Sequence, residues 1–390
     1  MGWRILPDLA AGAARGPVLS AKPDIAIIGT RGIPARYGGF ETLAEELAVR
    51  LVELGFGVTV YCRSQYTDRA LREYRGVRLV VLPAVRTKHL DTPTHTMLSC
   101  LHAAARGYDA VLVVNAANAV FLPLLRARGI PVALNVDGIE RQRAKWGALG
   151  RAVYSSSERL ATLFSDRLVA DAEVIRQYYR EHYGARPTVI AYGVEPRPQP
   201  PGPTLEQLGL EPRRYFLYVS RFEPENNPHR VAEAYRSVSG DLPLVMVGGA
   251  PYAAEFIRGF TEGADPRILF PGPIYGEGYR ELLTHALAYV QATEVGGTHP
   301  ALVEAMGYGN CLLVNDVPEH LEVTGDVAWT FDVGSADSLR EAFEKVLSDP
   351  AEAARRGREA AERARQRYTW SRVADQYADL LRSLVRNARR

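Results

Sequence analysis

Several features are scarce in this chain of 390 residues. Its three cysteines, Cys62, Cys100 and Cys311, lie far apart with no neighbouring Cys or His pair, which predicts reduced structural thiols, a cytoplasmic protein and no zinc site. No run of about 18 apolar residues occurs, which excludes a membrane-spanning helix. The net charge is only +2, and no basic run alternates with aromatics, so we expect no nucleic-acid partner.

The length and composition predict two globular domains. Hydrophobic residues make up 47% and charged residues 24% of the chain, and the length exceeds what one core normally organises. Residues 1–20 mix apolar residues with scattered charges, which favours a flexible tail over a signal peptide. Residues 194–203 are dense in proline and predict a linker. We therefore expect an N-terminal domain over 21–193 and a C-terminal domain over 204–371.

Both halves alternate apolar runs with segments long enough for crossover helices. This alternation predicts an α/β fold with two doubly wound parallel sheets. The helix expected after Gly39 has apolar residues at Phe40, Leu43, Leu47 and Leu51. Residues 337–390 are expected to be mostly helical. The predicted strands are 24–29, 58–61, 77–82, 110–114, 132–135, 167–170, 188–190, 215–220, 244–248, 268–270, 288–291 and 311–315.

The most informative stretch follows the predicted strand 288–291. Gly296 and Gly297 form a loop, and Pro300 is suited to the first position of a helix. The exposed N–H groups and the dipole of such a helix terminus can bind phosphate. Glu304 would lie about one turn inside, where a carboxylate can accept sugar hydroxyls. The stretch thus suggests a phosphate-linked sugar, with nucleotide sugars as the obvious class.

In each domain, one further segment of interest follows the first strand. Gly38 and Gly39 precede a helix and either approach a diphosphate or simply form a tight turn. Their spacing does not fit the dinucleotide fingerprint, which argues against a dehydrogenase. Arg221 either neutralises a diphosphate or forms a surface ion pair with Glu223 or Glu225.

Some polar residues of the first half allow two interpretations. Asp137 either caps a helix or contacts a sugar, and we favour the sugar contact. His89, Asp91 and His95 are read as solvated loop residues rather than acceptor contacts. The basic set at 141–145 beside Trp146 is read as solvated, with an anionic acceptor or a membrane surface as the alternative.

Together these motifs resemble retaining glycosyltransferases of family 4, which have the GT-B fold of two Rossmann-like domains facing a cleft. The resemblance covers the chain from about residue 23, and its sharpest parts resemble a bacterial rhamnosyltransferase-like subgroup. These parts are residues 29–34, 37–41, 135–138, 144–147, 221 with 224–227, 295–298 and 304–306. Residues 368–370 resemble the aromatic marker before a last helix, here 372–390, that crosses back to the N-terminal domain.

The resemblance assigns the N-terminal domain to the acceptor and the C-terminal domain to the donor. It also implies a role for each matched residue, with Arg221, Asp137 and Glu304 as the catalytic set. Its implied contacts are Gly38, Gly39, Arg221, Gly297 and Thr298 for the diphosphate; Asp137, Gly296, Gly297, Thr298 and His299 for the donor sugar; Glu304 for the ribose; and Gly272, Ile274 and Tyr275 for the base.

Three positions depart from the wider family. The family has two glutamates with seven residues between them, but Gly296 stands eight residues before Glu304, and Glu294 lies too early. Asn226 replaces the usual lysine, and Asp137 stands where many relatives have histidine. The subgroup shares these changes, so they imply a different donor sugar, rhamnose or another hexose, rather than lost activity.

We therefore expect a metal-independent retaining glycosyltransferase without a cofactor, since no Asp-x-Asp pair follows a strand. Its partners would be a nucleotide sugar and a hydroxyl acceptor: a glycan, a lipid-linked saccharide or a small molecule. A lipid-linked acceptor would bring peripheral contact with the cytoplasmic face of a membrane. The alternatives are a sugar-nucleotide epimerase using Asp137 and His299 for proton transfer, and an inactive nucleotide-sugar binding protein.

Overall fold

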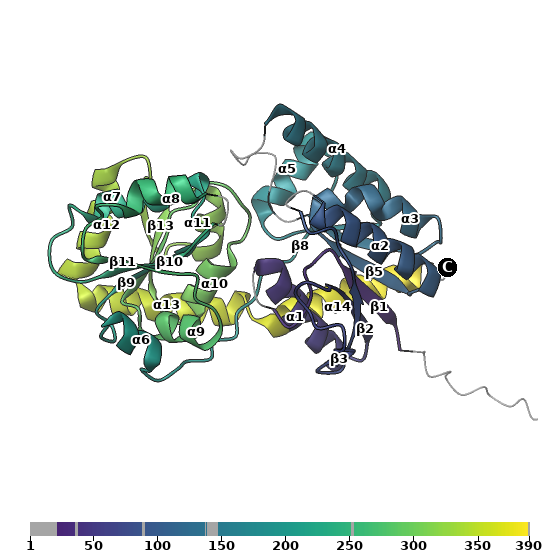
Figure 1. The fold of residues 1–390 in the computed structure, drawn as a ribbon, viewed down its shortest axis with the longest axis horizontal. Coiled ribbons are helices and arrows are strands. Elements are labelled where there is room, and N and C mark those ends of the chain that lie inside the picture. Colours follow the sequence, from purple (N-terminus) through teal and green to yellow (C-terminus); the bar gives the residue numbers. More distant parts are fainter. Residues whose placement is uncertain are drawn as a thin grey trace, which may run out of the picture.

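Two α/β units stand side by side in this computed structural model, and a proline-rich segment joins them (Figure 1). The structure describes residues 22–35, 38–87, 90–136, 138, 147–250 and 253–388. The predicted tail 1–20 and Asp137 lie outside these residues. Both sheets have strands in the shuffled order of a doubly wound fold, so the predicted fold class is confirmed.

The first unit contains an eight-stranded sheet in the order β3-β4-β2-β1-β5-β6-β7-β8. All of its pairs are parallel except β3 with β4, because β3 is joined to β4 by a tight turn at the sheet edge. Its strands are β1 Asp24–Ile28, β2 Gly57–Arg63, β3 Glu73–Tyr74, β4 Val77–Leu82, β5 Ala110–Val114, β6 Val132–Asn135, β7 Arg167–Ala170 and β8 Thr188–Val189. Its helices are α1 Gly39–Glu53, α2 Asp91–Arg106, the 3₁₀ helix η1 Ala116–Phe121, α3 Leu122–Arg126, α4 Ala148–Phe164 and α5 Glu173–Tyr183.

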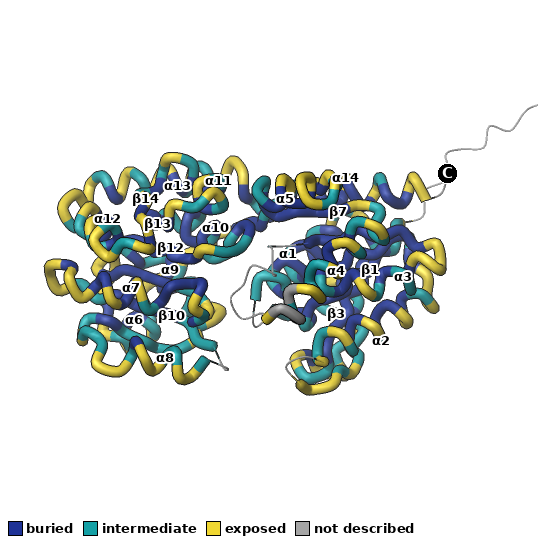
Figure 2. The backbone as a smooth tube through the Cα atoms, turned by 90° about the horizontal axis from the view of Figure 1, so that it is seen from above, coloured by how far each residue is buried: buried dark blue, intermediate teal, exposed yellow. Residues whose placement is uncertain are grey.

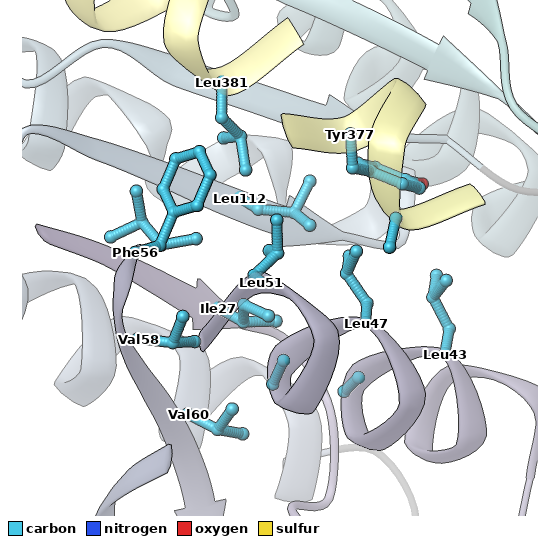
Figure 3. Close-up of a cluster of buried hydrophobic side chains, with 14 of the residues drawn as sticks. Ile27, Leu43, Leu47, Leu51, Phe56, Val58, Val60, Leu112, Tyr377 and Leu381 are labelled. Carbon is cyan, nitrogen blue, oxygen red and sulfur yellow. The ribbon is translucent and has the colours of Figure 1, made fainter. Parts of the chain in front are cut away.

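Helix α1 forms as its apolar spacing predicts. Leu43, Leu47 and Leu51 lie on one face of the helix and are buried against the β1–β2 side of the sheet (Figure 3). Tyr377 and Leu381, from the last helix of the chain, close the same cluster. The core of the first unit therefore includes residues from the C-terminus of the chain.

The second unit has a six-stranded parallel sheet in the order β11-β10-β9-β12-β13-β14. Its strands are β9 Phe216–Ser220, β10 Leu244–Gly248, β11 Ile268–Gly272, β12 Ala288–Gln291, β13 Cys311–Asn315 and β14 Trp329–Phe331. Its helices are α6 Pro203–Leu208, the 3₁₀ helix η3 Pro224–Asn226, α7 Pro228–Tyr235, α8 Ala254–Thr261, α9 Gly276–His285, α10 Pro300–Gly307, α11 Pro318–Thr324, α12 Ala336–Ser348 and α13 Pro350–Arg367.

The chain passes between the units twice. Residues 195–202 form neither helix nor strand, and Val194 pairs in parallel with Thr369 beside the second crossing. Helix α14 (Trp370–Ala388) then runs along the first unit, with buried and exposed residues alternating along it (Figure 2). The buried Asn135 Nδ2 donates to the Tyr377 hydroxyl at 2.7 Å, which connects α14 to the first sheet.

The three cysteines are buried and unbonded, as predicted. Burial raises the pKa of Cys62 to about 11 and that of Cys100 to about 12, so both thiols stay protonated at neutral pH. Within the described part of the chain, no helix has the length and apolar character needed to cross a membrane.

Candidate active site

A cleft of about 710 Å³ lies between the two units. It is formed by loops that follow the carboxyl ends of β1, β9 and β12, where ligands bind in open α/β sheets. Ten of the predicted site residues line it together: Gly38, Gly39, Arg221, Ile274, Tyr275, Gly296, Gly297, Thr298, His299 and Glu304. Gly272, the last residue of β11, does not line the cleft, although the next residue, Pro273, does. Asp137 lies outside the described residues.

The N-termini of two helices meet across the cleft. Helix α1 begins at Gly39 and helix α10 at Pro300, as the sequence predicts. A Cβ atom on Gly39 would lie 3.1 Å from Pro300 Cγ, so a larger residue would push the two termini apart. Both positive helix ends therefore face the same space, which favours an anionic ligand there.

A hydrogen-bonded contact between the units holds the 296–298 loop. The Thr298 N–H donates to Asp171 Oδ2 at 3.0 Å, and the Thr298 hydroxyl donates to the Asp171 carbonyl at 2.5 Å. A side chain on Gly297 would overlap the Asp171 carboxylate. In this conformation, Thr298 therefore directs its amide and hydroxyl at Asp171.

Asp171 itself was not predicted. It directly follows β7, and a polar residue at the carboxyl end of a strand was the available signal. Its partner on the other unit cannot be read from spacing, because the two residues are 127 positions apart.

A buried network fixes the ring of His299 at the start of α10. His320 Nδ1 lies 3.0 Å from the Asn315 carbonyl, and burial lowers the pKa of His320 to about 4, so this ring is neutral with its proton on Nδ1. The Thr293 hydroxyl, 3.0 Å away, then donates its only proton to His320 Nε2 and accepts from Gln291. His299 Nε2, 3.1 Å from Thr293, must therefore carry a proton and donate.

Glu304 lies on α10, and its carboxylate contacts helix α9. The Tyr279 hydroxyl donates to Glu304 Oε2 at 2.7 Å. Burial raises the pKa of Glu304 to about 6, against the opposing effects of Tyr279 and nearby Arg280. At neutral pH Glu304 is ionised and can accept hydroxyl donors.

Arg221 occupies the position after β9 that the sequence indicates. Its guanidinium is half-exposed and lies 3.7 Å from Glu223 Oε1, so the predicted ion pair and the predicted cleft position both occur. The Asn226 side chain donates to the Arg221 carbonyl at 2.7 Å. Asn226 thus holds the Arg221 backbone in place, where the wider family is expected to have a lysine.

No second glutamate takes the place of the one that is missing at Gly296 in the described part of the cleft. Glu294 accepts from the Asn227 side chain at 3.1 Å and is not part of the cleft lining. A Cβ atom on Gly296 would lie 2.6 Å from His299 Cε1. The His299 ring therefore occupies the space that a larger residue at position 296 would need.

The first unit contributes Arg63 and Thr92 to the cleft. Arg63 is buried at the end of β2 and pairs with Asp91 Oδ2 at 2.5 Å. The interpretation of Asp91 and His95 as solvated loop residues is wrong. Helix α2 begins at Asp91, whose carboxylate pairs with Arg63, and directs His95 into the interior, where it is fully buried. His89 lies outside the described residues, as does the basic set at 141–145 with Trp146.

Among the described side chains, no group of three or more His, Cys, Asp or Glu residues is arranged to hold a metal ion.

Two family models match the chain over most of its length. Residues 38–193 match a glycosyl transferase 4-like domain, and residues 205–364 match glycosyl transferases group 1. The chain contains two glycosyltransferase domains. The first of them contains Gly38 and Gly39, and the second contains Arg221 and Glu304.

Curated relatives are distant. These glycosyltransferase domains are 24% identical over 287 residues to the alpha-maltose-1-phosphate synthase of Mycolicibacterium smegmatis, covering 66% of this chain and 74% of that protein. They are 26% identical over 220 residues to the D-rhamnosyltransferase WbpZ of Pseudomonas aeruginosa, covering 52% of this chain and 56% of that protein. The second match gives the rhamnosyltransferase resemblance only weak support.

Solved structures confirm the GT-B arrangement of these glycosyltransferase domains. A sucrose-phosphate synthase from Thermosynechococcus elongatus has a TM-score of 0.78 at 20% identity, covering 93% of this chain and 99% of that chain. Anabaena HepE, solved in complex with UDP-glucose, has a TM-score of 0.76 at 17% identity, covering 93% of this chain and 100% of that chain. At sequence identities this low, these similarities support the fold and nothing further.

Proposed function

We propose that this protein transfers a sugar from a nucleoside-diphosphate sugar to a hydroxyl acceptor, with retention at the anomeric carbon. The observation that carries the proposal is the shared cleft, into which two helix N-termini, Arg221 and the Glu304 carboxylate all face. Cationic groups and helix ends suit a diphosphate, and a carboxylate suits ribose hydroxyls. The glycosyltransferase family matches give the epimerase alternative no support.

The proposed chemistry depends on stabilising the departing diphosphate. Arg221 and the amides at the starts of α1 and α10 would neutralise its growing charge. The acceptor hydroxyl would attack from the face that the diphosphate leaves, and a diphosphate oxygen would take the acceptor proton. This route requires no protein side chain as general base, and closure of the two units would exclude water.

We further propose that the reaction needs no metal ion, because protein cations and helix dipoles can supply the positive charge. Turnover should then be unchanged after the protein is treated with EDTA and returned to buffer without added metal. If turnover is lost and added Mg²⁺ or Mn²⁺ restores it, this part of the proposal is contradicted.

The donor sugar we propose is rhamnose or another hexose, transferred to a glycan, a lipid-linked saccharide or a small molecule. The missing second glutamate supports a donor that presents fewer hydroxyl groups, because Gly296 has no side-chain acceptor. Contact with a membrane surface would follow only from a lipid-linked acceptor.

A thermal-shift panel of UDP, GDP, dTDP, ADP and their sugars tests the proposal. At least one nucleotide should raise the midpoint of unfolding, because ligands that bind only the native state stabilise it. Product analysis with the best donor should then show nucleoside diphosphate released only with acceptor present. An epimerase would instead change the nucleotide sugar without acceptor, and the absence of any stabilisation would refute the proposal.

A further inference from the structure

The pair formed by Tyr279 and Glu304 restricts how the cleft can bind a nucleoside. Tyr279 comes from α9 and Glu304 from α10, and both line the cleft. The hydroxyl-to-Oε2 distance of 2.7 Å is that of a good hydrogen bond. One of the two carboxylate oxygens is therefore already bonded within the protein.

The direction of this hydrogen bond is fixed. Burial and the neighbouring Glu304 charge raise the pKa of Tyr279 well above its usual value, so the phenol keeps its proton and donates it. An ionised carboxylate can only accept. A ligand that displaces Tyr279 from Oε2 would leave the Tyr279 hydroxyl without its acceptor, which costs free energy.

The other oxygen, Glu304 Oε1, has no hydrogen-bond partner among the described residues. A carboxylate that binds two neighbouring hydroxyls of a ribose normally offers one oxygen to each of them. Here only Oε1 is fully available. Oε2 keeps one further acceptor site, which a second hydroxyl would have to share with the Tyr279 hydroxyl. Glu304 can therefore form one strong hydroxyl contact through Oε1, and a contact to Oε2 is weaker.

No other carboxylate in the described lining of the cleft supplies the second contact. In the described part of the cleft, the remaining glutamates come from the first unit and the linker, and each already accepts from other groups. Glu41 accepts from the Arg31 N–H at 2.9 Å, and Glu45 accepts from the Tyr74 hydroxyl at 2.8 Å. Glu46 and Glu195 both pair with Arg50.

We propose that this single open oxygen makes the site indifferent to the ribose 2′-hydroxyl, so that 2′-deoxyribonucleoside diphosphates and their sugars bind as well as the ribonucleotides. Tyr279 is then a specificity-determining residue that acts through Glu304. This inference rests on the proposed function, because it takes Glu304 as the ribose contact.

Calorimetric titration with matched nucleotide pairs tests the inference. UDP, GDP and ADP are each compared with the 2′-deoxy form of the same base, so that only one hydroxyl differs. For the best-bound base, we expect the two dissociation constants to agree within about threefold. Tyr279→Phe frees Oε2 for the 2′-hydroxyl, and a hydrogen bond to a charged group should then favour the ribonucleotide by about tenfold.

Tyr308→Phe is the matched control. Tyr308 lines the same cleft, but its hydroxyl contacts the Arg197 backbone instead of Glu304. This variant should keep the wild-type ratio of the two dissociation constants.

Two results would overturn the inference: dissociation constants of the two forms that differ by more than about threefold in wild-type protein, or a Tyr279→Phe ratio equal to that of wild type. Failure of every nucleotide to bind would overturn the proposed function, and this inference with it. A donor site that binds both forms unequally overturns the inference alone.

Discussion

Glu304 is ionised only above about pH 6, because burial raises the pKa of its carboxyl. Its neighbours act in opposite directions: Tyr279 and Arg280 favour the charged form, and Glu46 opposes it. The residue is thus positioned to lose its charge at mildly acidic pH. A neutral carboxyl accepts a hydrogen bond from a ribose hydroxyl more weakly than a carboxylate does.

Donor affinity should therefore fall as the pH drops through 6. At about pH 5, some nine-tenths of Glu304 would be protonated, so the affinity for the best nucleotide sugar should be about tenfold weaker than at pH 7.5. Calorimetry at both pH values measures this. Glu304→Gln should bind weakly at both, and an equally steep pH dependence in that variant would contradict the assignment.

Buried His95 should make the protein sensitive to acid. Burial is the main reason that its pKa falls to about 4, whereas the unfolded chain has the ordinary value near 6.5. As the pH falls from 6.5 to 4, the unfolded state takes up the proton and the folded state does not, so stability drops by roughly 3 kcal/mol.

Substitution of His95 by leucine should reduce this acid sensitivity. Neither ring nitrogen of His95 makes a hydrogen bond of normal geometry to the described residues, so His95→Leu leaves no orphaned partner. Chemical denaturation at several pH values gives the free energy of unfolding. A loss of stability on acidification that is as steep as in wild type would show that His95 is not responsible.

At the scale of elements, apolar periodicity and helix-start signals predicted the helices and strands that have a local sequence pattern. Helices α1 and α10 begin where Gly39 and Pro300 indicate, and the long buried strands appear as predicted. The edge strands β3 and β14 were missed, because two or three residues carry too little periodicity. His95 was misread because its helix begins earlier than the sequence suggests.

The close contact between the N-termini of α1 and α10 leads to a prediction for Gly39. Gly39→Val should separate the two helix termini, because even a Cβ atom would lie 3.1 Å from Pro300 Cγ. Turnover with nucleotide sugar and acceptor should drop at least about tenfold, as expected for displaced catalytic groups.

Gly259 provides the matched control for this substitution. It lies on the exposed side of α8, and a Cβ atom at this position would meet nothing within 4 Å among the described residues. Gly259→Val should keep wild-type turnover. Equal losses in both variants would contradict a special role for the contact between α1 and α10.

For the whole molecule, the contacts between the units lie beyond what the sequence can predict. Asp171 bonds to Thr298, and the Glu322 carboxylate accepts from the Glu173 N–H at the start of α5 at 2.8 Å and 2.9 Å. Both contacts join residues more than a hundred positions apart, so no local pattern marks them. The linker and α14, in contrast, lie next to the two domains in the sequence, so local sequence patterns mark them.

Removal of the Asp171 contact should let the units separate. Asp171→Ala removes the acceptor of the Thr298 amide, and the radius of gyration from small-angle scattering should increase relative to wild type. Glu181→Ala is the control, since Glu181 lies on the exposed side of α5 and bonds only to Gln177 among the described residues. An unchanged radius in Asp171→Ala would show that other contacts hold the units together.

The most direct test of the central claim measures how the best nucleotide sugar binds to wild-type protein and to Arg221→Ala and Glu304→Ala. If the cleft is the donor site, each substitution should weaken binding at least about tenfold, because each removes a charged contact, while circular dichroism stays unchanged. Wild-type affinity in both variants would contradict the account.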